Sequence, residues 1–82
     1  MSEITRRIRV YGIVQGVGFR PTVSRHATSN GIRGNVCNKG PYVEIFAQGA
    51  KEQIDGFLNE LKEHPPKRAA ILKIKSMSII FA

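Results

Sequence analysis

Two features of this 82-residue sequence could do chemistry, namely a glycine-containing loop that ends in an arginine and an asparagine further along the chain. Glycine tolerates positive φ, so successive N–H groups of such a loop can turn inward and form a nest for an anion. Arg20 adds a planar fork of donors, and Pro21 fits the first turn of a helix whose positive end would face the same anion. The predicted phosphate-binding residues are Gln15, Gly16, Val17, Gly18, Phe19 and Arg20.

The same loop has a plainer interpretation, because Gly-x-Gly between apolar residues is often only a tight turn from strand to helix. Its spacing also departs from the nucleotide-binding signatures G-x-G-x-x-G and G-x-x-x-x-G-K-[ST]. A large nucleotide is therefore not the expected ligand.

Asn38 is the second candidate, since it ends a predicted strand along which Gly34, Val36 and Asn38 alternate. A neutral amide at the end of a strand is usually a turn residue. It is also suited to orienting a water molecule, because it carries both donors and an acceptor. From the residues alone, both interpretations of Asn38 stay open.

The remaining reactive side chains are few, with Cys37 the single cysteine and His26 and His64 the two histidines. One cysteine cannot form an internal disulfide, and this set is too small for structural zinc. We interpret Cys37 as an inert thiol in a reducing compartment. Neither histidine has an acidic or hydroxyl partner at motif spacing, so both are expected on the surface. No metal or other cofactor is expected.

The hydrophobic periodicity predicts six elements. They are a strand over residues 4–14, a helix over 21–30, strands over 33–38 and 42–48, a helix over 50–64 and a strand over 71–80. Gly31 is predicted to end the first helix in the left-handed conformation, and Ile32 to fold back on its last turn. A change of phase between Ile71 and Ile74 predicts a bulge or bend in the last strand.

This order predicts an α+β fold, a ferredoxin-like βαββαβ sandwich in which a four-stranded antiparallel sheet carries two helices on one face. The other face stays open, and it should carry Arg9, Tyr11, Ile13, Tyr42 and Phe46. Such a mixture could stack nucleotide bases. However, Pro41 and Val43 stand where the RNA-recognition signature needs aromatic residues, so nucleic acid is not the expected partner. We expect an ordinary half-exposed sheet or a docking surface for another domain.

Length and charge limit the number of domains and the kinds of partner. A chain of 82 residues has room for one domain and one modest core. The net charge of +7 favours anionic partners without choosing among nucleic acid, an acidic membrane surface and small anionic substrates. The apolar runs are too short for a membrane span or a signal peptide, so we expect a cytoplasmic protein with no membrane partner.

The loop over residues 14–20, followed by Gly34-x-Val36-x-Asn38, resembles the acylphosphatase family, and the resemblance covers nearly the whole chain. The resemblance implies hydrolysis of a small acyl phosphate without a metal. It also implies two catalytic residues. The loop amides and Arg20 would hold the phosphate, while Asn38 would position the attacking water.

Further details resemble one branch, the N-terminal acylphosphatase-like domain of the hydrogenase maturation factor HypF, a carbamoyltransferase. These details are Phe19-Arg20-Pro21, the short turn after Asn38, and Pro65-Pro66 before Ala69-x-Ile71. The branch implies that residues 1–82 are one domain excised from a longer chain, with neighbouring domains as partners and carbamoyl phosphate as substrate. A free-standing acylphosphatase and a non-catalytic module that binds RNA or protein remain the alternatives. Lys39 and Pro41 of the turn are not expected to touch the loop.

Overall fold

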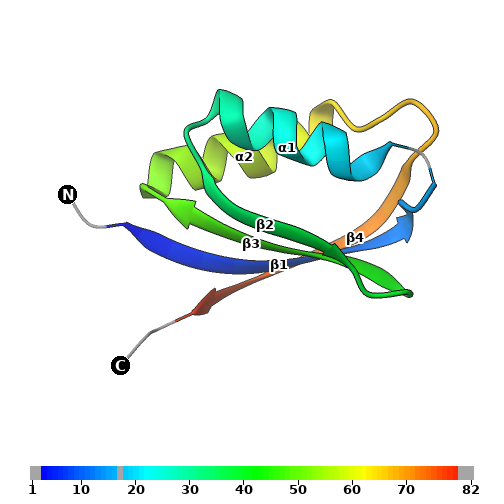
Figure 1. The fold of residues 1–82 in the computed structure, drawn as a ribbon, viewed down its shortest axis with the longest axis horizontal. Helices are drawn as coiled ribbons and strands as arrows, with labels where there is room; N and C mark the ends of the chain where they lie inside the picture. Colours follow the sequence, from blue (N-terminus) through cyan, green and yellow to red (C-terminus); the bar gives the residue numbers. More distant parts are fainter. Residues whose placement is uncertain (1–2, 17, 80–82) are drawn as a thin grey trace.

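Alternating and helical periodicity along the chain produces six elements in the computed structural model, which describes residues 3–16 and 18–79. They are β1 (Ile4–Ile13), α1 (Phe19–Ser29), β2 (Arg33–Asn38), β3 (Tyr42–Gly49), α2 (Lys51–Glu63) and β4 (Ala70–Ile79). The strands form one antiparallel sheet in the order β2-β3-β1-β4, and both helices cover the same face (Figure 1). The predicted ferredoxin-like fold is confirmed. Neither of these helices is long and apolar enough to cross a membrane.

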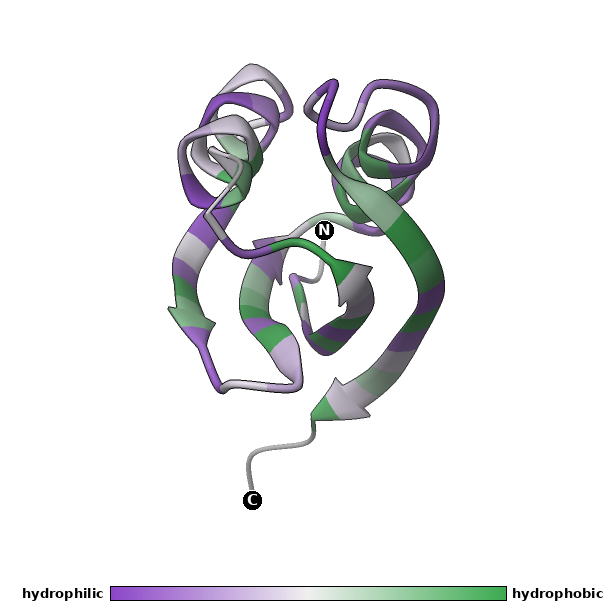
Figure 2. Ribbon diagram, turned by 90° about the vertical axis from the view of Figure 1, so that its right-hand side faces the viewer, coloured by the Kyte–Doolittle hydropathy of each residue, from purple (hydrophilic) through white to green (hydrophobic). Residues whose placement is uncertain are grey.

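The core lies between the sheet and the helices. Strand alternation sends one apolar set toward the helices, and the strands in Figure 2 show this alternation of hydrophobic and hydrophilic residues. The buried apolar residues are Ile8, Val10, Val14, Phe19, Val23, Val43, Ile45, Ala47, Ile54, Phe57 and Leu61. The helical contribution repeats every three or four residues, as an amphipathic helix requires.

Helix α1 begins at Phe19, two residues before the predicted start at position 21. Gly18 is the N-cap and adopts φ 74°. Pro21 then occupies the third helical position, where its missing N–H removes no hydrogen bond within the helix. The end of the helix follows the prediction, since Gly31 has φ 70° and the N–H of Ile32 donates to Ala27 O at 2.8 Å.

The predicted irregularity in the last strand is also confirmed. The register of β1 against β4 shifts between Tyr11 and Gly12, so Leu72 is the extra residue on β4. Gly12 has φ 133°, and a Cβ there would lie 2.1 Å from Ala70 O. The remaining element ends agree with the prediction to within one residue, except that residue 80 lies outside the described part of the chain.

His26 is less exposed than predicted. Its side chain is only 14% exposed, because it joins the two helices. Nδ1 lies 2.8 Å from Glu60 Oε2 and Nε2 lies 2.9 Å from His64 O. The acidic partner that His26 lacks nearby in sequence comes from α2 through helix packing. His64 itself is exposed, as predicted.

Candidate active site

A cavity of about 130 Å³ lies at the end of the sheet where β1 leads into α1 and where β2 ends. It is lined by Val14, Gln15, Gly16, Gly18, Phe19, Arg20, Pro21, Asn38 and Val43. Figure 1 shows the loop before α1 and the β2–β3 turn at this same end of the molecule. The fold therefore brings the predicted loop and the predicted asparagine, which lie on different elements, to one place.

The backbone of the loop requires its glycines. Gly16 and Gly18 have φ of 70° and 74°, the left-handed region that other residues rarely adopt. No atom lies within 4 Å of where a Cβ would stand at either position. Glycine is therefore favoured by the backbone conformation and not by a lack of space. Val17, which lies between them, is outside the described residues.

The start of α1 supplies donors to this cavity. Because Gly18 is its N-cap, the first N–H groups of the helix have no acceptor within it, and they carry the positive end of the helix dipole. Phe19 is 2% exposed and anchors the first turn in the core. Arg20 is exposed beside it, and within residues 3–16 and 18–79 its guanidinium makes no ion pair. The helix start is suited to binding an anion.

The β2–β3 turn is joined to both parts of the site through Gly40. Asn38 Oδ1 accepts a hydrogen bond from Gly40 N–H at 2.9 Å, which leaves Nδ2 as the end of the amide able to donate to a ligand. Gln15 Nε2 donates to Gly40 O. We predicted that Lys39 and Pro41 do not touch the loop. The turn does contact the loop, but through the backbone oxygen of Gly40. The sequence carries no signal for this contact.

The groups around the cavity are backbone N–H donors, the guanidinium of Arg20 and the side-chain amides of Gln15 and Asn38, a set suited to binding oxyanions. Across the described residues, no three His, Cys, Asp or Glu side chains gather as metal ligands would. A second cavity of about 160 Å³ lies between α1 and β2, but its lining includes neither Arg20 nor Asn38. The chemistry predicted from the sequence therefore concerns the first cavity.

Fold and cavity together define a small α+β domain with a loop suited to binding an oxyanion at one end of its sheet. The sequence profile of the acylphosphatase family matches residues 6–79, nearly the whole chain. The chain belongs to the acylphosphatase family of hydrolases.

Its relatives are of two sizes. A probable carbamoyltransferase HypF from Methanocaldococcus jannaschii is 53% identical over 68 residues, which are 83% of this chain and 9% of that protein. An acylphosphatase from Caldivirga maquilingensis is 42% identical over 67 residues, 79% of this chain and 70% of that protein. The crystal structure of full-length HypF in its phosphate- and nucleotide-bound form matches with a TM-score of 0.92 at 36% identity, over 95% of this chain and 10% of that one. The chain thus spans about a tenth of the length of HypF.

Proposed function

We propose that this chain hydrolyses the carboxyl–phosphate bond of acyl phosphates, with carbamoyl phosphate as its preferred substrate. In this proposal it is the N-terminal domain of a longer, cytoplasmic hydrogenase-maturation carbamoyltransferase, whose other domains are its partners. The observation that carries the catalytic part is that Arg20 and Asn38 line the same cavity. The similarity to HypF supports the substrate and the longer chain.

The loop and the helix start bind the phosphoryl group. The N–H groups between Gln15 and Arg20 donate to its oxygens, and Arg20 adds a charge-assisted pair of bonds from its planar guanidinium. The conformations of Gly16 and Gly18 and the buried Phe19 would hold the donors of the described loop residues in place before substrate arrives. Donors arranged in advance stabilise the charge that the transition state spreads over the phosphoryl oxygens.

Asn38 acts on the attacking water. Its Oδ1 is held by Gly40 N–H, so Nδ2 donates to the water oxygen and places it in line with the bond that breaks. The water oxygen forms a new bond to phosphorus, the bond from phosphorus to the acyl oxygen breaks, and a proton of the water passes to a substrate oxygen. The products are phosphate and a carboxylate, or carbamate when the substrate is carbamoyl phosphate.

The first test measures phosphate release from carbamoyl phosphate and acetyl phosphate by the wild type and by Arg20→Ala and Asn38→Ala. Loss of one preorganised donor costs about 10²–10³ in rate, so both variants should lose most activity. Arg33→Ala is the matched control, because Arg33 starts the strand that Asn38 ends and lines no part of this cavity. Full activity in a folded Arg20→Ala or Asn38→Ala protein contradicts the proposal, with circular dichroism as the test of folding.

The alternative within the same chemistry is a free-standing acylphosphatase. The extent of the match to the Caldivirga maquilingensis enzyme, 70% of its length, supports it. The ratio of kcat/KM for carbamoyl phosphate to that for acetyl phosphate distinguishes the two. A ratio above one favours the carbamoyl-phosphate assignment, and a ratio below one favours a general acylphosphatase.

A further inference from the structure

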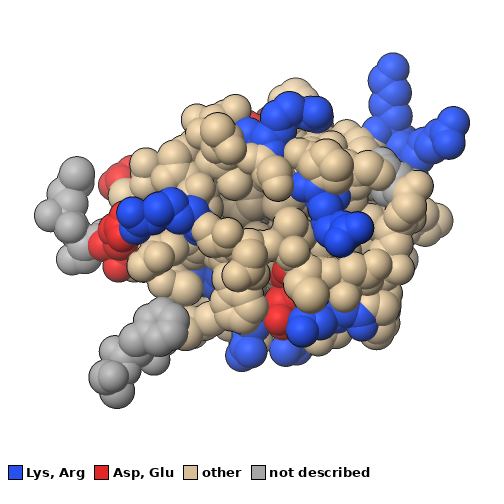
Figure 3. Space-filling model, in the orientation of Figure 1, with Lys and Arg blue, Asp and Glu red and all other residues tan. Residues whose placement is uncertain are grey.

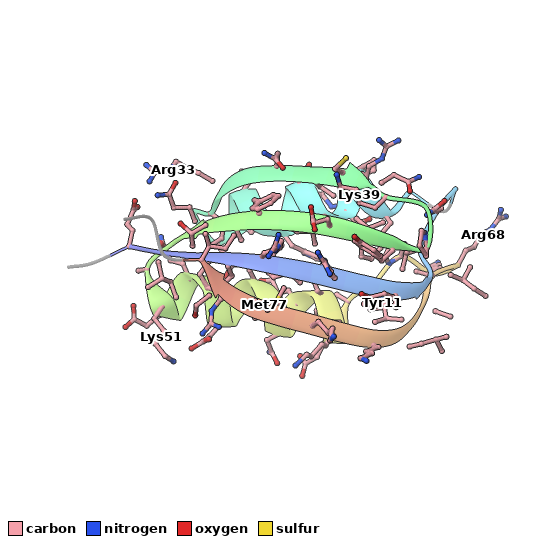
Figure 4. The ribbon with its side chains drawn as sticks, turned by 90° about the horizontal axis from the view of Figure 1, so that it is seen from below. Tyr11, Arg33, Lys39, Lys51, Arg68 and Met77 are labelled. Atoms are coloured by element: carbon pink, nitrogen blue, oxygen red, sulfur yellow. The ribbon has the colours of Figure 1, made fainter. Side chains whose placement is uncertain are left out.

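The face of the sheet that the helices do not cover has its own composition. We call it the open sheet face, and Figure 4 views the molecule from this side, with Tyr11 and Met77 labelled. Strand alternation and register place on it the residues that lie opposite the buried set. They include Arg7, Arg9 and Tyr11 of β1, Tyr42, Glu44 and Phe46 of β3, and Lys73, Lys75 and Met77 of β4.

Positive charge dominates this face. Glu44 is the acidic residue of that set, and it is 6% exposed because Arg9 covers it, with Nε 3.2 Å from Oε2. The hydrogen bond that Arg9 donates to the Glu44 carboxylate raises the pKa of the Arg9 guanidinium. Lys73 and Lys75 are exposed. In the side view of Figure 3, basic atoms gather along the lower margin, the side away from the helices. The face therefore favours an acidic partner.

Arg7 adds an unmet polar requirement to the same face. Its Nε is buried and has no hydrogen-bond acceptor among the described residues. A buried donor without an acceptor costs about 1–3 kcal/mol. A partner carboxylate that formed a bidentate pair with this guanidinium would supply the missing acceptor.

The aromatic rings of this face argue against a nucleic-acid partner. Tyr11 and Tyr42 lie against each other, with centroids 5.2 Å apart and planes inclined by 46°. Arg9 lies 5.0 Å from the Tyr42 centroid, and Lys73 lies 6.0 Å from that of Tyr11. Since single-stranded nucleic acids stack their bases on open aromatic faces, rings covered by cations offer poor platforms.

Exposed apolar side chains complete the surface. Met77 is 38% exposed on the open sheet face, and Ile13 and Leu72, beside the bulge at one end of it, are 62% and 82% exposed. Protein interfaces combine apolar anchors with charged groups around them. An acidic segment with apolar side chains at intervals matches both features.

We propose that the open sheet face is a docking surface for an acidic protein segment that carries apolar anchors. This inference does not depend on the hydrolase proposal, since the cavity lies at the end of the sheet and none of these face residues lines it. The cations attract the carboxylates, and Met77, Ile13 and Leu72 contact the apolar side chains.

The experiment measures fluorescence anisotropy of a labelled peptide of Glu-Glu-Leu repeats, with Gln-Gln-Leu repeats and an oligouridylate of equal charge as comparison probes. We expect salt-sensitive binding of the acidic peptide, weakened about tenfold in Lys73→Glu/Lys75→Glu, because complementary charges become repulsive. Lys51→Glu/Lys62→Glu on α2 is the matched control, since it has the same net charge and should bind within about twofold of the wild type.

Three outcomes overturn the proposal. The first is no binding of the acidic peptide by the wild type. The second is an equal loss in the two double variants, which would indicate a response to net charge alone. The third is an oligouridylate that binds more tightly than the peptide and is lost in Lys73→Glu/Lys75→Glu, which would make this a nucleic-acid surface. Thermal melts of both double variants establish that each is folded.

Discussion

Asn38 shows how a turn can set the role of a catalytic side chain. The bond from Gly40 N–H to Oδ1 determines which end of the amide meets the turn and which end can meet a ligand. An asparagine at the end of a strand is usually a turn residue. Asn38 takes part in the turn through its Oδ1 atom. The proposed catalytic role belongs to the other atom, Nδ2.

Asn38→Asp separates these two roles. The variant keeps an oxygen for Gly40 N–H but replaces Nδ2 with a carboxylate oxygen, which cannot donate to water and repels the phosphoryl group. We expect phosphate release to fall by at least about 10² with little change in the melting temperature. If Asn38 only closed the turn, Asn38→Asp would retain activity, and that result would contradict the water-positioning role.

Residue types and spacing predicted the loop and Arg20 as an anion site, because those signals are local, and the resemblance to the acylphosphatase family added Asn38 to it. The contact between the Gln15 side chain and Gly40 O was beyond prediction. It joins a side chain to a backbone carbonyl 25 residues away, and every residue has such a carbonyl. A contact of this kind follows only from the arrangement of elements.

At the scale of elements, the link from His26 to Glu60 and His64 holds α1 against α2. The double-mutant cycle of His26→Ala and Glu60→Ala should give a coupling of about 0.5–1 kcal/mol in the free energy of unfolding. The control cycle is Lys51 with Asp55, an exposed pair within α2 at 2.8 Å, for which about 0.3–0.5 kcal/mol is expected. Denaturant unfolding measures both. Strict additivity at His26 and Glu60 would show that the contact between these two side chains contributes nothing.

The bulge in β4 depends on Gly12. Gly12→Ala places a Cβ 2.1 Å from Ala70 O at φ 133°, so both backbone strain and a clash with β4 oppose it. Gly40→Ala is the control, with φ 95° and no atom within 4 Å of its Cβ. Strain alone costs about 1–3 kcal/mol, and Gly12→Ala should lose clearly more stability than Gly40→Ala. Equal losses in thermal or denaturant unfolding would refute this account of the bulge.

The sequence predicted these elements unequally, for physical reasons. The phase change between Ile71 and Ile74 revealed the bulge, since strand alternation is a local signal. The start of α1 was placed too late because Pro21 suggested a first position, whereas proline is tolerated throughout the first turn. The partner of His26 could not be predicted, because Glu60 is brought to it by packing between the helices.

At the scale of the whole molecule, the net charge of +7 is distributed over more than one surface. Lys73 and Lys75 lie on the open sheet face, whereas Arg20 alone brings a positive side chain to the cavity lining. In the proposed mechanism, the backbone donors of the loop and the Arg20 guanidinium together attract the anion. The affinity for an anion should depend on folding, because the unfolded chain has no such arrangement of N–H groups.

Phosphate, a product of the proposed reaction, should therefore stabilise the fold. A ligand at about ten times its Kd adds about 1.4 kcal/mol to the free energy of unfolding. For a domain of this size that raises Tm by roughly 6–11 °C. Phosphate is also excluded from protein surfaces and stabilises many proteins without a site, but that effect grows steadily with concentration, whereas binding saturates.

Arg20→Ala distinguishes the two effects, because it should keep the gradual rise in Tm and lose the saturating part. Thermal melts across a phosphate series, with sodium chloride at matched ionic strength, measure both proteins. An identical, non-saturating rise in the wild type and in Arg20→Ala would mean that the loop does not bind phosphate. The loss of the saturating part in Arg20→Ala alone would show that the stabilisation of the domain by bound phosphate depends on the Arg20 guanidinium.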